Sequence, residues 1–190
     1  MSQGEVEGTL ILGISDSHCA TACLLRDGEV IGCLSEERLT RIKNQGGYPR
    51  RAVESLMSQG NVKPEEISAV ALAGHEAMDV EWFELVTRDE KYIDKYFGVK
   101  KGGILRRKVR RWGKRLGFSG EAPGKQHLPN EKRFQEIASH IGIPKSNIHI
   151  VEHHTSHAAA AYYGSPFAFQ DQSAAVLTND ASGDGLCATW

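Results

Sequence analysis

Long hydrophobic runs are missing from this sequence of 190 residues. The apolar stretches Leu10–Leu12 and Ala69–Ala73 are far shorter than the roughly 18 residues that a transmembrane helix needs. The first eight residues are polar and acidic, so they have neither the basic start nor the apolar stretch of a secretory signal. The sequence therefore predicts a cytoplasmic protein with no membrane span.

Cysteine is scarce, and its spacing excludes two kinds of structure. Cys19, Cys23, Cys33 and Cys187 contain no C-x-x-C pair, and the cytoplasm keeps thiols reduced. Neither a framework of disulfides nor a thiolate zinc site is indicated. We expect the four cysteines to be small buried apolar residues.

The chain also has no large excess of charge, with 23 basic and 24 acidic residues, but its positive charge is concentrated. Nine of the basic residues lie between Lys100 and Arg115, with no acidic residue among them. This run predicts an insertion or lid over residues 79–124. It is typical either of an anion site, for phosphate or a polyanion, or of a solvated helical face. A polyanion or nucleic-acid binding module is therefore an alternative function, although the absence of interleaved aromatic residues disfavours nucleic acid.

Short apolar segments separated by turn residues predict an α/β fold. Asp27-Gly28 between two such segments is a strong hairpin signal, and Pro49 can open a helix that Gly60 ends. We expect a mixed five- to six-stranded sheet with helices on both faces. Its predicted strands are 9–15, 20–26, 29–34, 67–73, 147–151 and 174–178, and its predicted helices are 50–60, 128–141 and 156–163.

Two histidines at helical spacing form the first candidate site. His153 and His157 stand four residues apart at the entrance to an alanine-rich helix, where they share one face, while His154 points elsewhere. Such a pair can hold one divalent metal ion if a further ligand completes the set. A helix cap or a simple hydrogen-bonded pair of histidines remains the alternative.

A glycine-rich acidic segment, predicted to be a loop after a strand, forms the second candidate site. Its backbone N–H groups can contact phosphate oxygens, and Asp180 or Asp184 can bind a cation or orient water. The alternative is a tight β-turn in which Asp and Gly only provide the turn angles. The candidate residues are Asp180, Ser182, Gly183, Asp184 and Gly185.

The third candidate site follows the first predicted strand. In an extended chain Asp16 and His18 project to the same side, where they can act as an acid/base pair or satisfy local turn groups. The charged run from Glu36 to Lys43 follows the hairpin. Without further information, that run is typical of an exposed, salt-bridged turn.

Taken together, these segments resemble the amino-terminal part of the family of nodulation-factor and antibiotic O-carbamoyltransferases. The run Glu36-Glu-Arg-Leu-Thr-Arg-Ile-Lys43 resembles the family's E-E-R-x-T-R-x-K signature, with Arg38, Arg41 and Lys43 as candidate phosphate-binding residues. The segments His153–Pro166 and Asp180–Gly185 resemble its H-H-x-x-H-A-x-S-A and D-G-x-G-D motifs. Residues 9–60 and 148–190 carry the resemblance.

The resemblance implies an actin-like or Hsp70-like ATPase fold with a ribonuclease H-like lobe, related to the tRNA threonylcarbamoyl enzymes. It implies that His153 and His157 bind a divalent metal, iron in the family, with zinc or manganese as substitutes. The later Asp that completes the family's iron site has no counterpart here, so the third ligand is open. Asp16 and His18 align with residues assigned to the acceptor and to transfer.

For the complete enzymes, the resemblance implies a second lobe and a YrdC-like domain. That domain makes carbamoyl-adenylate from ATP and carbamoyl phosphate, and the carbamoyl group then passes to the hydroxyl of a small-molecule acceptor. The sequence here predicts one truncated amino-terminal lobe over residues 1–190, inactive alone and prone to self-association through an exposed apolar face. Cys19 and Ala181 depart from the family pattern, which has an acidic residue and a glycine at these positions.

Overall fold

The computed structural model describes residues 8–75, 77–78, 127–128, 130–170 and 172–190. The chain divides into two units, residues 1–78 with 127–190 and residues 79–126, and the described residues all belong to the first unit. The predicted insertion at residues 79–124, with its basic run Lys100–Arg115, lies outside the described residues.

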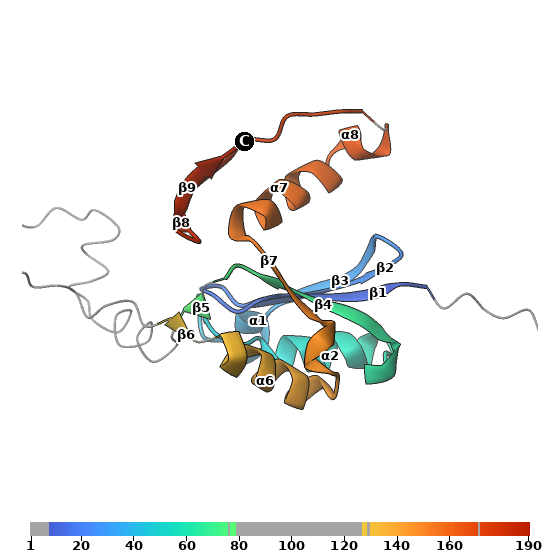
Figure 1. The fold of residues 1–190 in the computed structure, drawn as a ribbon. Helices are drawn as coiled ribbons and strands as arrows, with labels where there is room; N and C mark the ends of the chain where they lie inside the picture. Colours follow the sequence, from blue (N-terminus) through green and yellow to red (C-terminus); the bar gives the residue numbers. More distant parts are fainter. Residues whose placement is uncertain (1–7, 76, 79–126, 129, 171) are drawn as a thin grey trace, which may run out of the picture. The chain divides into compact units, whose positions relative to one another are not determined.

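A five-stranded mixed sheet forms the centre of the first unit, in the order β3-β2-β1-β4-β7 (Figure 1). Strands β1 (Leu10–Ser15), β2 (Thr21–Arg26) and β3 (Glu29–Ser35) are antiparallel neighbours, and β4 (Ile67–Ala73) and β7 (Ile148–Val151) run parallel to β1. This is the α/β class and the mixed sheet that the sequence predicts, consistent with a ribonuclease H-like lobe.

The turn between β2 and β3 confirms the predicted hairpin. Asp27 and Gly28 both have positive φ angles, 52° and 85°, which is the backbone that a two-residue turn needs to match the twist of the strands. The Asp27 side chain accepts a hydrogen bond from the Thr9 N–H at 2.8 Å. The turn is therefore also fastened to the start of β1.

The hydrophobic core lies between the sheet and two helices. Alternate residues of β1 are buried, as are the apolar faces of α2 (Arg50–Gln59) and α6 (Asn130–Ile141). These two helices cover one face of the sheet, and α7 (His153–Tyr163) follows β7 on the other side (Figure 1). Because β1, β4 and β7 run in the same direction, their carboxyl ends lie at a common edge of the sheet. Ligand sites of open α/β sheets usually form at this edge.

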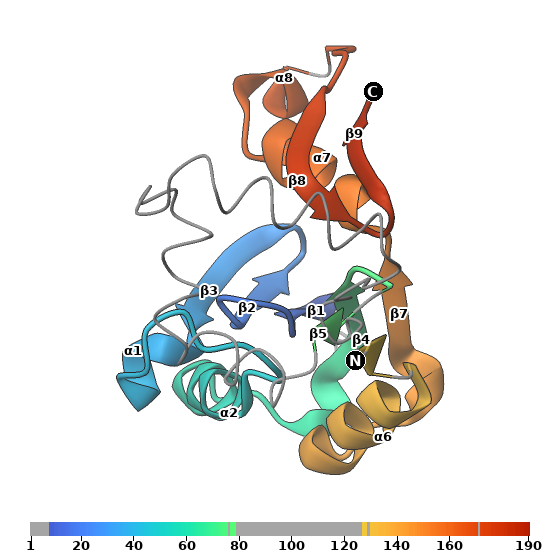
Figure 2. The same ribbon diagram turned by 90° about the vertical axis from the view of Figure 1, so that its left-hand side faces the viewer.

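The remaining elements are short. They are α1 (Glu36–Thr40), the 3₁₀ turns η1 (Pro64–Glu66) and η2 (Lys145–Asn147), β5 (Ala77–Met78) paired with β6 (His127–Leu128), and α8 (Pro166–Phe169). A second hairpin, β8 (Thr178–Gly183) with β9 (Leu186–Thr189), contacts α7 (Figure 2). No helix among the described residues is both long and apolar enough to cross a membrane.

Two expectations from the sequence are wrong. The predicted strand 174–178 lies instead at Thr178–Gly183, so Asp180 stands within a strand and only Asp184 and Gly185 form the turn. The cysteines are not core residues, because Cys19, Cys33 and Cys187 are exposed and Cys23 is half-buried. Alternation in β2 and β3 places Cys23 and Cys33 away from the core face.

Candidate metal centre

Helix α7 places two imidazoles at its first turn, directly after β7. Glu152 is the N-cap, and its carboxylate accepts the backbone N–H groups of His154 at 3.0 Å and Thr155 at 2.7 Å. These hydrogen bonds lower the pKa of Glu152 below its ordinary value. The cap fixes the start of the helix, so that His153 and His157 lie one turn apart on the same face.

Asp180 of β8 joins these two histidines. Its Oδ2 lies 2.8 Å from His153 Nε2 and 3.5 Å from His157 Nε2, and the two Nε2 atoms are 3.0 Å apart. Three donor atoms thus form a compact triangle whose residues are half-buried or exposed. The resemblance left the third ligand open, and the sequence placed Asp180 in a phosphate-binding segment where it or Asp184 could bind a cation.

The triangle has the size that a transition-metal ion requires. Donors about 2.1 Å from a metal lie about 3.0 Å apart at right angles and about 3.4 Å apart in a tetrahedron. The three separations fall close to this range, and two imidazoles with one carboxylate are the donor set of many iron and zinc sites. The residues therefore fit a divalent metal and leave positions open for further ligands.

Gly183 holds the His153 ring in place. A Cβ atom at Gly183 would lie 1.9 Å from His153 Cδ2 and 2.3 Å from His153 Nε2, well inside any permitted contact. The bare backbone of β8 therefore lies directly against the imidazole. Only glycine leaves room for the ring at this position.

Asp184 ties the β8–β9 turn to the sheet and to α7. Its carboxylate accepts the N–H of His75, just after β4, at 2.9 Å and the N–H of His153 at 2.8 Å. The turn residue Gly185 follows with φ at 81°. Asp184 thus positions the hairpin that carries Asp180, a role that the phosphate-binding prediction did not include.

Asp16 is a buried partner of Arg133 in α6. Both of its carboxylate oxygens accept from the guanidinium, Nε to Oδ2 and Nη2 to Oδ1, each at 2.8 Å. Arg133 also donates to the carbonyl oxygens of Gly74 and His75 at 3.0 Å. This network joins the ends of β1 and β4 to the start of α6.

His18 and Asp16 lie in different environments. His18 is exposed in the β1–β2 turn, whereas Asp16 is buried. The chain turns after Asp16, and Cys19 has a φ of 56°, so the extended backbone assumed for the pair is wrong. The catalytic roles predicted for both residues stay predictions.

The charged run 36–43 divides into a buried and an exposed part. Glu36 is buried and accepts the N–H groups of Arg51 and Ala52 at the start of α2, so it is not part of an exposed turn. The candidate phosphate-binding residues Arg38, Arg41 and Lys43 are exposed, and their side chains make no hydrogen bond or ion pair to other described residues. Of Ser182 the structure describes only the backbone, within β8.

His154 points away from the donor triangle, as the sequence predicts. It is fully buried, and its Nδ1 lies 2.7 Å from Thr178 Oγ1, which in turn lies 2.8 Å from Thr189 Oγ1. Its Nε2 has no hydrogen-bond partner among the described residues. His154 thus links the start of α7 to both strands of the β8–β9 hairpin.

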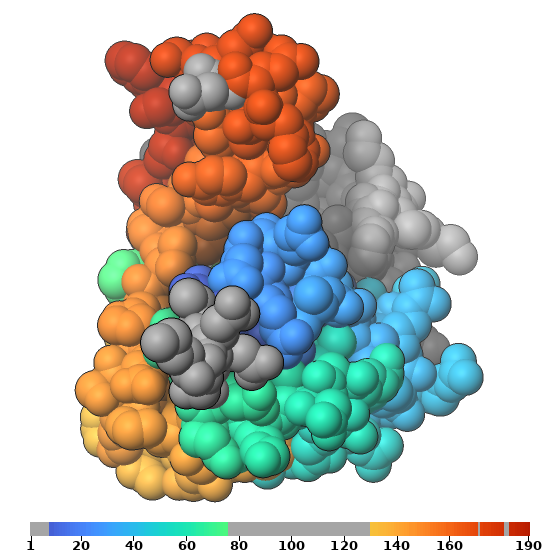
Figure 3. Space-filling model, turned by 90° about the vertical axis from the view of Figure 1, so that its right-hand side faces the viewer, coloured from blue at the N-terminus to red at the C-terminus, as the bar shows by residue number. Residues whose placement is uncertain are grey.

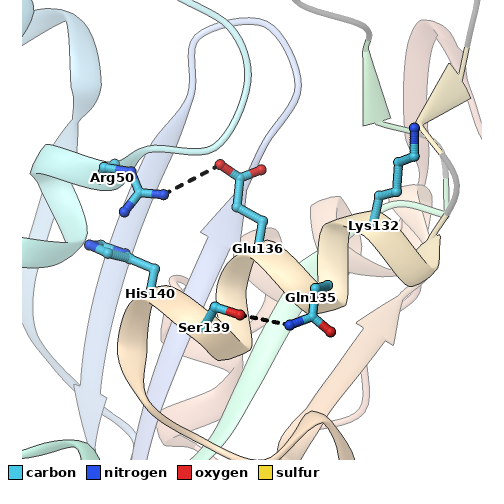
Figure 4. A pocket seen from close by; sticks show the side chains of 6 residues that line it. All are labelled: Arg50, Lys132, Gln135, Glu136, Ser139 and His140. Carbon is cyan, nitrogen blue, oxygen red and sulfur yellow. Dashed lines mark hydrogen bonds and ion pairs between the residues drawn. The ribbon is translucent and has the colours of Figure 1, made fainter.

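A separate pocket of about 370 Å³ lies between residues of α2 and α6 (Figure 4). An ion pair of 3.6 Å between Arg50 and Glu136 crosses it. None of the predicted site residues lines this pocket, whose walls are Arg50, Lys132, Gln135, Glu136, Ser139 and His140.

Sequence reasoning missed three contributors to this edge of the sheet: the ring contact of Gly183, the cap Glu152 and the buried Arg133. It offered Asp180 or Asp184 as a cation ligand but did not join Asp180 to the histidine pair. Asp180 carried a signal, since a carboxylate at a strand near an H-x-x-x-H pair is a natural third ligand. Arg133 carried none, because a single arginine in an amphipathic helix usually faces solvent.

The chain is similar to carbamoyltransferase sequences over nearly its whole length. Residues 10–188 match the family model described as "Carbamoyltransferase N-terminus". The nodulation protein NolNO of Sinorhizobium fredii is 28% identical over 180 residues, which are 94% of this chain and 22% of that protein.

Two relatives described only as uncharacterized proteins also match. The one from Synechocystis is 26% identical over 179 residues, 93% of this chain and 26% of that protein. The one from Methanocaldococcus jannaschii is 43% identical over 65 residues, 34% of this chain and 12% of that protein. The chain thus spans about a quarter or less of each of these relatives. By its match over residues 10–188, it belongs to the carbamoyltransferase amino-terminal family.

Proposed function

We propose that this chain forms the metal-binding and acceptor-binding lobe of an O-carbamoyltransferase. Family membership supports the reaction type, and the triangle of His153, His157 and Asp180 is the observation that supports metal assistance. The reaction passes a carbamoyl group from carbamoyl-adenylate, made from ATP and carbamoyl phosphate, to a substrate hydroxyl. The hydroxyl oxygen attacks the carbamoyl carbon, the adenylate leaves, and the hydroxyl proton passes to a base.

A divalent ion bound by the three side chains, iron in the resembling family, would polarise the carbamoyl carbonyl or bind phosphate oxygens. The chain's own residues prepare that site. Gly183 leaves room for the His153 ring beside β8, and Asp184 fixes the hairpin that presents Asp180. In this proposal Asp180 is a metal ligand and Asp184 a positioning residue.

His18 is the proposed acid/base group of the lobe. It is exposed in the β1–β2 turn, so its imidazole is accessible to a hydroxylated acceptor. Imidazole is the side chain that most often moves protons in enzymes. Asp16, held by Arg133 at both oxygens, would place the turn that carries His18.

Phosphate groups of the donor need cationic partners. Arg38, Arg41 and Lys43 are exposed and free of protein partners among the described residues, which is the state in which such side chains can bind an anion. As the family resemblance implies, a second lobe and a YrdC-like domain would supply the carbamoyl-adenylate. The 190-residue chain alone is expected to bind metal and to lack transfer activity.

Metal binding tests the proposal directly. Iron(II), manganese(II) and zinc(II) are titrated into the chain by calorimetry under anaerobic conditions. We expect one site, with affinity reduced 10- to 100-fold or more in His153→Ala, His157→Ala and Asp180→Ala. His149→Ala, which removes an exposed histidine of β7 outside the triangle, is the matched control. Equal binding by all four variants would overturn the metal centre.

Transfer is tested in a polypeptide that also carries the second lobe and the YrdC-like domain. With ATP, carbamoyl phosphate and a panel of hydroxylated acceptors, we expect product whose mass is increased by one carbamoyl group. His18→Ala is expected to lower kcat by about 10²- to 10⁴-fold, the usual contribution of a general base. Unchanged kcat in His18→Ala would assign the proton transfer to another group.

A further inference from the structure

Cys23 and Cys33 stand directly opposite each other in the β2–β3 ladder. Opposite residues of antiparallel strands have Cα atoms about 4.5 or 5.5 Å apart, depending on the hydrogen-bonding pattern. Both values lie within the range of about 4.4–6.8 Å that separates the Cα atoms of disulfide-bonded cysteines. The separation of the two Cα atoms is therefore one that a disulfide can span.

The two thiols also face the same side and already influence each other. Side chains of directly paired residues lie on one face of a sheet, and here it is the face opposite the core residues Ala22 and Leu24. Burial, followed by the adjacent Cys33 thiol, raises the pKa of Cys23 to about 11. Cys33 is the exposed member of the pair.

A small reagent can reach this pair. The β2–β3 hairpin lies at the surface, in blue in Figure 3. On the other flank of Cys23 its partner in β1 is Gly13, which has no side chain, so no bulky group stands beside the thiol there. Cys33 itself is exposed and lies in β3, the edge strand of the sheet.

We propose that Cys23 and Cys33 are a reversible oxidation site, which low-molecular-weight disulfides convert to a cross-strand disulfide. The Cys33 thiolate attacks a disulfide RS–SR and forms Cys33–S–S–R, with release of one RS⁻. Cys23 then loses its proton and attacks the Cys33 sulfur, expelling the second RS⁻. The protein loses two protons and two electrons, and the small disulfide is reduced to two thiols.

The remaining two cysteines have no cysteine opposite them and should react differently. Cys19 lies in the β1–β2 turn and Cys187 in β9, and both are exposed without a cysteine opposite them. Oxidation there stops at a mixed disulfide with the reagent. The register of the sheet alone therefore predicts which pair closes. This inference is independent of the proposed carbamoyl transfer, since it involves none of the metal or acceptor residues.

The test uses oxidised glutathione on the 190-residue chain, followed by intact-mass measurement and peptide mapping without reduction. In Cys19→Ser/Cys187→Ser, which keeps only the paired thiols, we expect loss of two hydrogen masses, a Cys23–Cys33 peptide and full reversal by dithiothreitol. In Cys23→Ser, we expect glutathione to remain attached at Cys33. Circular dichroism of each variant shows whether it is folded.

Two results would overturn the proposal. One is a Cys19→Ser/Cys187→Ser variant, folded by circular dichroism, that accumulates glutathione adducts without closing the disulfide. The other is closure that occurs only in urea, because the pair would then meet only in the unfolded chain. Closure in the native protein, with the mixed disulfide trapped in Cys23→Ser, supports the assignment.

Discussion

At the scale of single residues, Gly183 is the most constrained position of the candidate metal centre. A methyl group at this position would occupy the space of the His153 ring. We predict that Gly183→Ala turns the imidazole out of the donor triangle and lowers metal affinity at least 10-fold, with the core intact. Calorimetric titration with zinc(II) measures the affinity, and the thermal midpoint reports the fold.

Gly13→Ala is the matched control for that substitution. A Cβ at Gly13 would meet its nearest neighbours, the carbonyl oxygen and Cβ of Cys23, at 3.7 and 3.8 Å, which are ordinary contacts. Metal affinity should therefore stay at the wild-type value. Equal loss in both variants would mean that any Gly→Ala change weakens the site, and the ring contact would not be its cause.

The buried pair of Asp16 and Arg133 gives a prediction on stability. Removing one partner leaves the other charge buried, which costs about 3–5 kcal/mol in comparable cases. We expect Asp16→Ala and Arg133→Met each to lower the free energy of unfolding by about this amount, measured by urea denaturation. Lys145→Ala removes an exposed ion pair with Glu131 and should cost less than about 1 kcal/mol.

A loss below about 1 kcal/mol in both buried variants would show that water reaches the pair in solution.

The pair of Asp16 and Arg133 also shows which part of the site could not be predicted from the sequence. The position of Asp16 at the end of a strand was readable from the alternation of Leu10, Leu12 and Ile14. Its partner was not, because it lies 117 residues away and nothing local in α6 marks Arg133 as buried.

At the scale of elements, helices α2 and α6 are joined by a chain of side chains. Tyr48, just before α2, places its hydroxyl 2.8 Å from His140 Nδ1, and His140 Nε2 lies 3.0 Å from Glu54 in α2. Burial raises the pKa of Tyr48 above its ordinary value of 10.0. The contact between α2 and α6 therefore depends on the protonation state of the half-buried phenol of Tyr48.

The raised pKa of Tyr48 determines the direction in which the free energy of unfolding changes with pH. Above about pH 10 the tyrosine of the unfolded chain ionises while the folded one stays neutral, so the unfolded state gains stability. We predict that the free energy of unfolding of the wild type falls with rising pH in this range. In Tyr48→Phe the fall is smaller, although the variant starts about 1 kcal/mol lower at neutral pH for want of the hydrogen bond.

Urea denaturation at intervals between about pH 8 and about pH 11 measures both curves. Tyr163→Phe, which changes an exposed tyrosine of α7, is the control and should follow the wild type. Parallel curves for the wild type and Tyr48→Phe would contradict the assignment of the alkaline instability to this residue.

The order of elements was predictable from the sequence, but the position of one strand was not. Strands β1, β2, β4 and β7 follow apolar runs, and turn residues bound them, so local pattern was sufficient. The segment 174–177 is apolar as well, yet the strand begins at Thr178. Its partner β9 and the bonds from Thr178 and Asp184 decide this register, and neither is visible in the local sequence.

At the scale of the whole unit, the sheet order explains why three distant segments supply one site. Strands β1, β4 and β7 run parallel, so their carboxyl ends meet at one edge. Asp16, His75 and His153 follow these three strands and belong to one continuous set of contacts through Arg133 and Asp184. Strand direction thus brings chain segments more than a hundred residues apart to one edge, and the contacts of Arg133 and Asp184 join them there.

The β8–β9 hairpin is the element of this set that the proposed metal ion would stabilise most. It belongs to a separate two-stranded sheet, and the apolar residues Leu177, Leu186 and Trp190 within and beside it are exposed and add little to the core. A metal ion held by His153, His157 and Asp180 would cross-link α7 to β8. Because the ion binds only the folded arrangement, it stabilises that arrangement by about 2.7 kcal/mol at a hundredfold excess over Kd.

We therefore predict that metal loading slows amide hydrogen exchange mainly in β8, β9 and the first turn of α7. Exchange in β1, β2 and β4, which open only with the whole sheet, should slow only as far as global stability rises. Mass-spectrometric exchange with zinc(II) and with excess chelator measures both regions in one sample. In Asp180→Ala the protection of the hairpin should disappear, because the ligand that β8 gives to the triangle is lost, while His149→Ala should keep it. Uniform protection across all strands would mean that the ion binds outside the triangle and does not cross-link α7 to β8.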